Sequence, residues 1–284
     1  MTYFYSIEPA ILRNPLRRGI RHRISAERSV LHPNDAPCTM SEFLEACRQQ
    51  PPENIEIWDV AEADLTALLH EFGASMIDLH LYLKAGSLAD LACLTSLKKL
   101  SLVHMGERVA LWELAQNTAL EVAELRFPNC TRLENAAGLT GAAMRQLKLY
   151  ADGISCPKPV PAPLFDVALL ATLPQLKKAE IYMAPPQDPV ASLKALASLS
   201  HLEELHLFEN SFTFAQFAWL FTKLPHTHGF GGVVNFYPDR ERDTHMMVIS
   251  GSDRPDLPIA EEEAVHAAFR AACKLYEGTP EPPQ

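Results

Sequence analysis

Three histidines in the last quarter of the chain are its clearest candidates for metal binding. His226 and His228 stand two residues apart, and His245 follows in the next apolar stretch. Imidazole nitrogens are common zinc ligands, but a site also needs further ligands at suitable spacing. No cysteine or acidic residue has such spacing, and the histidines flank turns. We therefore expect a turn rather than a metal site, and no cofactor.

The same region contains Gly229, Gly231 and Gly232, which raises the question of a phosphate-binding loop. No lysine–serine pair or dinucleotide pattern follows these glycines, so the pattern is typical of a turn between a helix and a strand. Nothing in the chain resembles a nucleophile motif of the known hydrolases. Chemistry at His226–Asp239 therefore stays an alternative that no motif supports.

A repeated apolar pattern is the stronger signal. Leu202, Leu205 and Leu207 follow the spacing L-x-x-L-x-L, and Asn210 completes L-x-x-L-x-L-x-x-N. A helical run precedes them, with Asp188 as its expected N-cap and Pro189 in its first turn. Aligned on the middle apolar position, seven copies have the anchors Ile55, Leu79, Leu100, Leu125, Leu147, Ala179 and Leu205.

The spacing between successive anchors lies between 21 and 32 residues. The longest interval contains a proline-rich insertion, Cys156–Pro163. Repeats of 20–29 residues that alternate a helix with a short strand are typical of solenoids, in which each turn covers its neighbour. The competing interpretation is a set of unrelated amphipathic helices in an ordinary α/β domain.

Residues 41–237 resemble a bacterial-type leucine-rich repeat protein with irregular repeats. The resemblance implies an α/β solenoid with a parallel sheet on its concave face and helices on its convex face. The asparagine position departs from the family pattern, because only Asn210 fills it and Cys130 is an accepted substitute. The family's ladder of buried asparagines is therefore expected to be mostly missing, with turns of uneven shape.

The two ends of the chain do not fit the repeat. Residues 1–40 carry six arginines between Arg13 and Arg28. We expect a cap over the first turn, with a dock for an acidic partner or for anions as the alternative. Val234 is expected in an eighth strand, and Met246–Ile249 in a closing strand. Residues 238–284 form the C-terminal cap, with a helix that Gly278 ends and a disordered segment from Thr279 to Gln284.

Strand geometry assigns an outward face, because side chains alternate along a strand. In this family the outward residues line the concave face. One outward row comprises Trp58, Tyr82, Val103, Pro128, Tyr150, Tyr182 and Phe208. The row beside it comprises Glu56, His80, Ser101, Arg126, Lys148, Glu180 and His206. Five aromatic residues in the first row predict a protein interface with a basic centre at Arg126 and Lys148; the alternative is that aromatic residues merely suit strands.

Composition narrows the class of partner. The formal net charge of −10 argues against nucleic acid, which requires a basic track. No segment reaches the length of a membrane span, and the first residues do not form a secretory signal. The six cysteines have no C-x-x-C pairs and are expected to be free thiols, so we expect a cytoplasmic monomer without a membrane partner.

These observations predict a protein that is not an enzyme and that binds another protein on its concave face. The binding residues would be Trp58, Tyr82, Arg126, Lys148, Tyr150, Tyr182, His206 and Phe208. One specific version, by analogy with small acidic solenoids, is an immunity protein that neutralises a bacterial toxin. The alternative is an enzyme or effector with its site around His226–Asp239.

Overall fold

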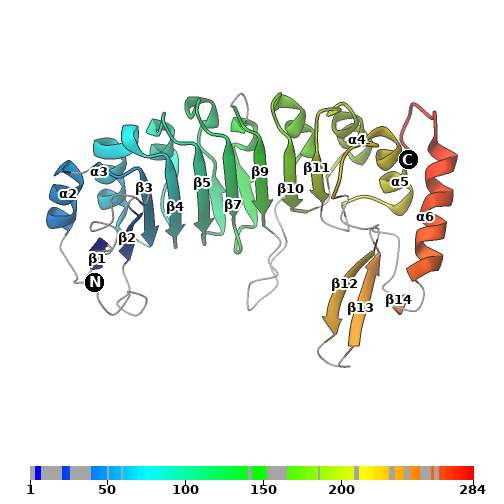
Figure 1. Cartoon of the computed structure of the whole chain (residues 1–284), viewed down its shortest axis with the longest axis horizontal. Coiled ribbons are helices and arrows are strands. Elements are labelled where there is room, and N and C mark those ends of the chain that lie inside the picture. Colours follow the sequence, from blue (N-terminus) through cyan, green and yellow to red (C-terminus); the bar gives the residue numbers. More distant parts are fainter. Residues whose placement is uncertain are drawn as a thin grey trace, which may run out of the picture. The chain divides into compact units, whose positions relative to one another are not determined.

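The computed structural model is an α/β fold in which parallel strands alternate with helical segments (Figure 1). It describes residues 4–7, 21–25, 40–49, 51–58, 60–139, 143–151, 165–184, 186–207, 211–229, 234–239, 244–249, 257–258 and 262–284. For some of these residues the structure describes the backbone but not the side chain: 4–7, 21–25, 40–43, 46, 58, 234–239, 244–249, 257–258 and 262. The described residues form two compact units, which meet in the sequence between Met144 and Arg145.

The first unit alternates strands with helices and short 3-10 turns. Its strands are β1 Phe4–Ile7, β2 Arg21–Ser25, β3 Asn54–Trp58, β4 Asp78–Leu83, β5 Lys99–His104, β6 Arg108–Ala110, β7 Val122–Arg126 and β8 Arg132–Glu134. Its helices are α2 Met40–Gln49 and α3 Glu62–Phe72, and its 3-10 turns are η2 Gly73–Ser75, η3 Ala89–Cys93, η4 Leu114–Gln116 and η5 Ala136–Gly138.

The main sheet of this unit has the order β1-β2-β3-β4-β5-β7. Strand β1 pairs antiparallel with β2, and every later pair is parallel. Leu79 lies opposite Ile55 and Leu100, in the register that the repeat alignment predicts. The side chains of β4 alternate between half-buried and buried, and Leu79 is 0% exposed. Alternate leucines therefore point into the core beneath the helical segments.

The alignment is wrong by two residues at β7. Leu100 lies opposite Ala123, whereas the repeat pattern placed it opposite Leu125. The cause is that L-x-x-L-x-L fits twice here, once from Leu120 and once from Val122. A shift of two residues preserves the inward and outward assignment because the side-chain period of a strand is two. It does, however, move Arg126 into the aromatic row in place of Pro128, and it removes Cys130 from the asparagine position.

Side-chain amides connect successive turns of the first unit, although they do not occupy the consensus position. The buried Asn117 donates to the carbonyl oxygens of Leu91 and Leu94 at 2.8 and 3.0 Å, and its Oδ1 accepts from Trp112 at 2.7 Å. Asn129 donates to Met105 O, and Asn135 donates to Leu111 O, 24 residues earlier in both cases. These bonds satisfy buried carbonyl groups in the turns, which is the role expected of the missing ladder.

A second, two-stranded sheet in this unit joins β6 to β8 in parallel. Arg108 pairs with Arg132, and Ala110 with Glu134, so the offset is 24 residues, as in the asparagine contacts. The sequence analysis did not predict this sheet, because each strand contains only three residues and neither shows a clear apolar alternation.

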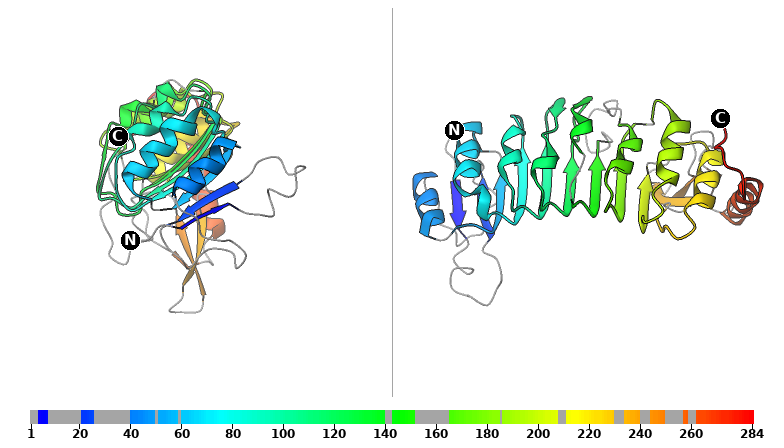
Figure 2. Two further views of the ribbon diagram at one scale, coloured as in Figure 1. Left: turned by 90° about the vertical axis from the view of Figure 1, so that its left-hand side faces the viewer. Right: turned by 90° about the horizontal axis from the view of Figure 1, so that it is seen from above.

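The second unit contains three parallel strands, four helical segments and a separate antiparallel sheet. Its strands are β9 Gln146–Tyr150, β10 Lys178–Tyr182, β11 Glu204–Leu207, β12 Val234–Asp239, β13 Thr244–Ile249 and β14 Leu257–Pro258. Its helices are α4 Pro189–Ala197, α5 Phe214–Lys223 and α6 Glu262–Tyr276, and its 3-10 helix is η6 Val167–Thr172. In Figure 2 the helical segments that connect the parallel strands within each unit lie on one face of those strands.

The order β9-β10-β11 has the register that the repeats predict, with Ala179 opposite both Leu147 and Leu205. Helix α4 begins after Asp188, whose carboxylate accepts from the Ala191 amide at 2.9 Å. Helix α5 begins at a capping box between Thr213 and Gln216. The start of α4 agrees with the N-cap predicted from the sequence.

The region after α5 differs from the prediction of an eighth parallel strand at Val234. Strand β12 instead pairs antiparallel with β13, and β13 pairs with β14, in a separate sheet. Among the described residues after α5, a parallel bridge joins His228 to Glu204 of β11. Apolar residues alternate in β12 as they do in the repeats, so the sequence pattern alone did not distinguish the two arrangements.

Four of the six cysteines lie among the described residues. Cys47, Cys93, Cys130 and Cys273 are free thiols, as predicted for them, whereas Cys38 and Cys156 lie outside the described residues. Along the described part of the chain, no helix combines the length and apolar character needed to cross a lipid bilayer.

Candidate functional site

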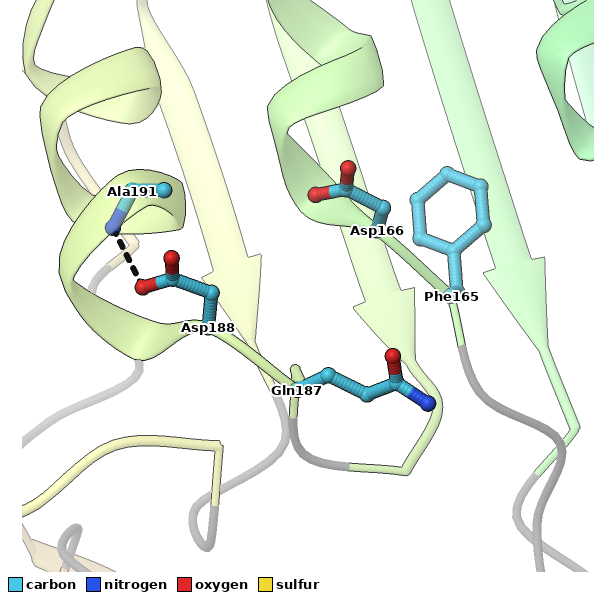
Figure 3. A pocket seen from close by; sticks show the side chains of 5 residues that line it. All are labelled: Phe165, Asp166, Gln187, Asp188 and Ala191. Atoms are coloured by element: carbon cyan, nitrogen blue, oxygen red, sulfur yellow. Dashed lines mark hydrogen bonds between the residues drawn. The ribbon is translucent and has the colours of Figure 1, made fainter.

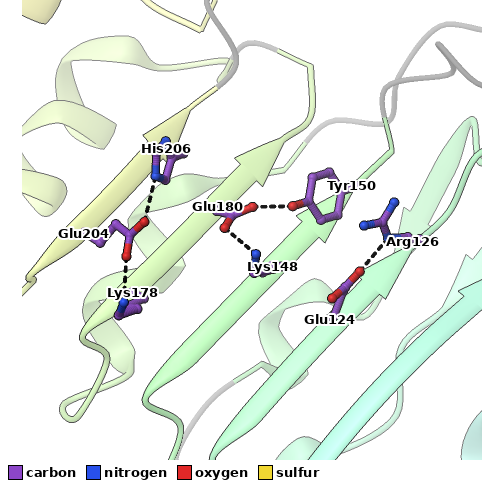
Figure 4. A network of polar contacts seen from close by, with 8 residues as sticks. All are labelled: Glu124, Arg126, Lys148, Tyr150, Lys178, Glu180, Glu204 and His206. Atoms are coloured by element: carbon purple, nitrogen blue, oxygen red, sulfur yellow. Dashed lines mark hydrogen bonds and ion pairs between the residues drawn. The ribbon is translucent and has the colours of Figure 1, made fainter. Parts of the chain in front are cut away.

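The outward face of β9, β10 and β11 gathers aromatic and charged side chains within one compact unit (Figure 4). We call it the tyrosine face, and it consists of Lys148, Tyr150, Lys178, Glu180, Tyr182, Glu204 and His206. Each of these side chains comes from an outward position, because the residues between them on the strands are buried leucine, alanine and isoleucine. The alternation that builds the core therefore also builds this face.

Two tyrosines of the tyrosine face lie side by side at the ends of β9 and β10. The rings of Tyr150 and Tyr182 are stacked, with centroids 5.2 Å apart and 12° between the ring planes. The two residues are direct partners in the parallel register of β9 and β10. Neighbouring in-register strands lie about 4.8 Å apart, so the strand spacing itself brings the rings into contact.

Glu180 fixes this aromatic pair from the adjacent position on β10. One of its carboxylate oxygens accepts a hydrogen bond from the Tyr150 hydroxyl, and the other lies 2.5 Å from Lys148 Nζ. Burial raises the pKa of the Glu180 carboxyl, but the hydrogen bonds from Lys148 and Tyr150 outweigh it, so its pKa lies below the usual value. Glu180 is therefore charged at neutral pH and holds Tyr150 in one orientation.

Glu204 organises the second part of the tyrosine face. Its carboxylate lies 2.8 Å from Lys178 Nζ and 2.9 Å from His206 Nε2. The hydrogen bonds from Lys178 and His206 lower the pKa of Glu204 to about 2. The ring of His206 packs against Gly229, which has φ +80°, and a Cβ there would lie 2.6 Å from His206 Nε2. The glycine turn seen in the sequence thus leaves room for this ring.

The outward residues of the first unit also form pairs of opposite charge. Arg126 Nε lies 2.6 Å from Glu124 Oε1, and His80 Nε2 lies 3.3 Å from Asp78 Oδ1. Tyr82 is half-buried on β4, between Trp58 of β3 and Val103 of β5 in the strand register. The described part of this aromatic row therefore combines Tyr82 with Val103 and Arg126.

The predicted basic centre is wrong as a description of the charge. Each cation of the predicted basic centre forms an ion pair with a carboxylate, Arg126 with Glu124 and Lys148 with Glu180. Aligning the repeats shows which residues point outward, but it does not show which oppositely charged side chains lie close enough to pair. Paired charges within a few ångströms produce little field at a distance.

Two of the predicted binding residues fall wholly or partly outside the description. Trp58 ends β3, and its side chain is not described, while Phe208 lies outside the described residues altogether, as does Asn210. The structure brings together Lys148, Tyr150, Tyr182 and His206, which belong to one compact unit, and it adds Lys178, Glu180 and Glu204. The sequence signal for these three residues was that oppositely charged residues occupy equivalent positions in neighbouring repeats, which places them side by side on adjacent strands.

A cavity of about 340 Å³ lies elsewhere in the second unit (Figure 3). It is lined by Phe165, Asp166, Gln187, Asp188 and Ala191. Both carboxylates are used as helix caps, because Asp166 accepts from the Ala168 amide and Asp188 from the Ala191 amide, each at 2.9 Å. The acidic side chains thus have a structural role, and we assign the cavity no ligand.

The structure describes the side chains of two of the three histidines considered for metal binding. His226 and His228 are exposed in the turn after α5, and the side chain of His245 on β13 is not described. Among the described residues, no group of three or more histidine, cysteine or acidic side chains is arranged to hold a metal ion. No model of a known protein family matches the chain, and no curated protein matches its sequence.

Proposed function

We propose that the chain is a leucine-rich repeat solenoid that binds another protein through the outward face of its parallel strands, without catalysing a reaction. The repeat assignment is supported by strand offsets of 24 and 21 residues across β3, β4 and β5, and of 32 and 26 across β9, β10 and β11. Inward leucines at equivalent positions and asparagine bonds between turns agree with it.

The observation that carries the binding proposal is the stacked pair Tyr150 and Tyr182, held in place on the tyrosine face by Glu180. Tyrosine gives a large contact area and loses little conformational entropy on binding, and aromatic residues are enriched among the energetic anchors of interfaces. Because Glu180 already orients Tyr150, this anchor would be ordered before the partner arrives.

The paired charges of the tyrosine face suggest how the partner is recognised. The ion pairs of Lys148 with Glu180 and of Lys178 with Glu204 neutralise charge locally, so the face suits a partner surface of mixed polarity. We therefore propose recognition by shape and aromatic packing, with hydrogen bonds at the rim, and not by long-range attraction to an acidic partner.

Partner capture with matched variants tests this proposal. Wild-type protein, a Tyr150→Ala/Tyr182→Ala variant and a Leu275→Ala control are used as baits in extract from the source cell. Leu275 is a 76% exposed apolar residue on α6, so its replacement also removes apolar surface, but from a helix. The proposal expects one partner retained by wild type and control and lost by the double variant; retention by all three baits contradicts it. The immunity-protein version further expects that partner to be a toxin whose activity this chain inhibits.

A further inference from the structure

The segment after α6, Thr279–Gln284, lies in the second unit and binds to α4 and α5, although the sequence predicts disorder for it. We call it the proline segment, because it reads Thr-Pro-Glu-Pro-Pro-Gln. Helix α6 ends at Tyr276, and Gly278, which has φ +75°, lies in the turn that follows, where the chain turns toward α5. Figure 1 shows the end of the chain beside α5.

Two side-chain donors of α5 bind backbone carbonyl groups of the proline segment. Trp219 Nε1 donates to Thr279 O at 3.2 Å, and Gln216 Nε2 donates to Pro283 O at 3.3 Å. Lys194 of α4 lies 2.5 Å from Glu281 Oε2, and Pro282 is buried. An aromatic residue, carbonyl-directed donors and a buried proline together are the features by which proline-rich peptides are recognised.

The two donor side chains are buried. Trp219 is 2% exposed and Gln216 is 4% exposed, so their polar atoms need partners. Gln216 Oε1 accepts from the Thr213 amide at 3.0 Å, while the nitrogen of the same amide group donates to Pro283 O. The capping box of α5 therefore orients the donor that contacts the proline segment.

We infer that α4 and α5 form a binding groove for proline-containing peptides, which the chain's own proline segment occupies. Three of its six residues are proline, which lack an N–H and leave their carbonyl groups free to accept. The ligand class is a partner segment with a Thr-Pro-acid-Pro-Pro pattern, which displaces the resident segment. This groove lies apart from the tyrosine face, so either proposal can fail while the other stands.

The first test uses the full chain with Pro282→Asp, which places a charge where the structure buries a proline. The probe is a fluorescent peptide, Glu-Gly-Thr-Pro-Glu-Pro-Pro-Gln. We expect at least tenfold tighter binding to the variant than to wild type, because the resident segment no longer fills the groove. Fluorescence polarisation measures the affinities, and circular dichroism checks folding. Equal, negligible binding to both folded proteins overturns the inference.

Donor variants in the Pro282→Asp chain test the mode of recognition. Gln216→Glu keeps the oxygen of the capping box but removes the donor to Pro283 O, and Trp219→Phe removes the donor to Thr279 O but keeps an aromatic ring. Each should weaken peptide binding about fivefold, as expected for a lost hydrogen bond. The control is Leu275→Ala. Unchanged affinity in both donor variants contradicts the assignment.

A charge exchange provides an independent arm should Pro282→Asp fail to fold. Lys194→Glu repels the resident Glu281, and a peptide carrying Glu281→Lys should then bind this variant in preference to the wild-type peptide. The opposite preference, or none, overturns the inference. If the groove instead exchanges segments between two copies, wild type will dimerise with increasing concentration and the free peptide will not bind in preference, which also overturns it.

Discussion

Tyr150 and Tyr182 are stacked on adjacent strands although the proline-rich stretch Cys156–Pro163 lies between them in the sequence. The parallel register of β9 and β10 places them opposite one another, and Glu180 holds the Tyr150 hydroxyl. A stacked pair on a partly exposed strand face provides the apolar contact area that an interface anchor requires.

Replacing Tyr182 by alanine should weaken partner binding by at least about 2 kcal/mol, as the loss of an interface anchor does. Tyr182→Phe keeps the ring that stacks on Tyr150 and should retain most of the affinity. Isothermal titration calorimetry with the captured partner measures both variants. Equal losses for Phe and Ala would assign the energy to the hydroxyl group, and no loss for Ala would remove Tyr182 from the interface.

Lys148→Met tests the local role of the lysine. The change removes the ion pair with Glu180 and keeps a side chain of similar length. Because we propose a partner surface of mixed polarity, the association rate with the partner should change little, and should depend weakly on salt. The dissociation rate should rise, since Glu180 holds Tyr150. Stopped-flow kinetics at two salt concentrations measures both rates. A large, salt-dependent fall in the association rate would contradict this account.

Acid should destabilise the fold partly through Glu204. The pKa of this carboxyl is lowered to about 2 in the folded state by its hydrogen bonds to Lys178 and His206, so it stabilises the fold above its ordinary pKa of 4.5. That contribution is lost as the pH falls from 4.5 toward 2. Glu204→Gln should be less stable than wild type at pH 7, and the difference should shrink toward pH 2. Urea unfolding across this pH range measures it; a constant difference would contradict the assignment.

Leucines that point inward should matter more for stability than tyrosines that point outward. Leu100 is 2% exposed and Leu147 is 0% exposed. Leu→Ala at either position should cost about 2–5 kcal/mol, because it leaves a cavity in the core. Tyr150→Ala should cost much less. Equal losses in chemical denaturation would show that the inward and outward assignment is wrong.

Asn117 should be the most sensitive of the asparagines that connect turns in the first unit. Its amide nitrogen donates to two carbonyl groups, and its amide oxygen accepts from the Trp112 indole N–H. The side chain is 0% exposed. Asn117→Ala should cost at least about 2 kcal/mol, because buried polar groups lose their partners. Asn129→Ala removes one bond to Met105 O at a half-buried site and should cost less. A smaller loss for Asn117→Ala than for Asn129→Ala would contradict this ranking.

The sequence was sufficient to predict the alternation of buried and outward residues, because that depends only on the two-residue period of a strand. It did not determine the register of β7, where apolar residues satisfy the repeat pattern at both Leu120 and Val122. It also missed the ion pairs of the tyrosine face and the docking of Thr279–Gln284. These depend on neighbours from other strands and helices, such as Glu180 for Lys148 and Gln216 for Pro283, which the sequence pattern does not bring together.

Hydroxyl-radical footprinting of the complex tests the binding proposal most directly, since it reports the exposure of individual tyrosine side chains. Tyr150 and Tyr182 are half-buried in the free chain, and Tyr276 on α6 is a half-buried internal control. The account predicts that oxidation of Tyr150 and Tyr182 falls several-fold when the partner binds, while that of Tyr276 is unchanged. Unchanged oxidation of Tyr150 and Tyr182, with protection confined to the residues around His226–Asp239, would contradict it.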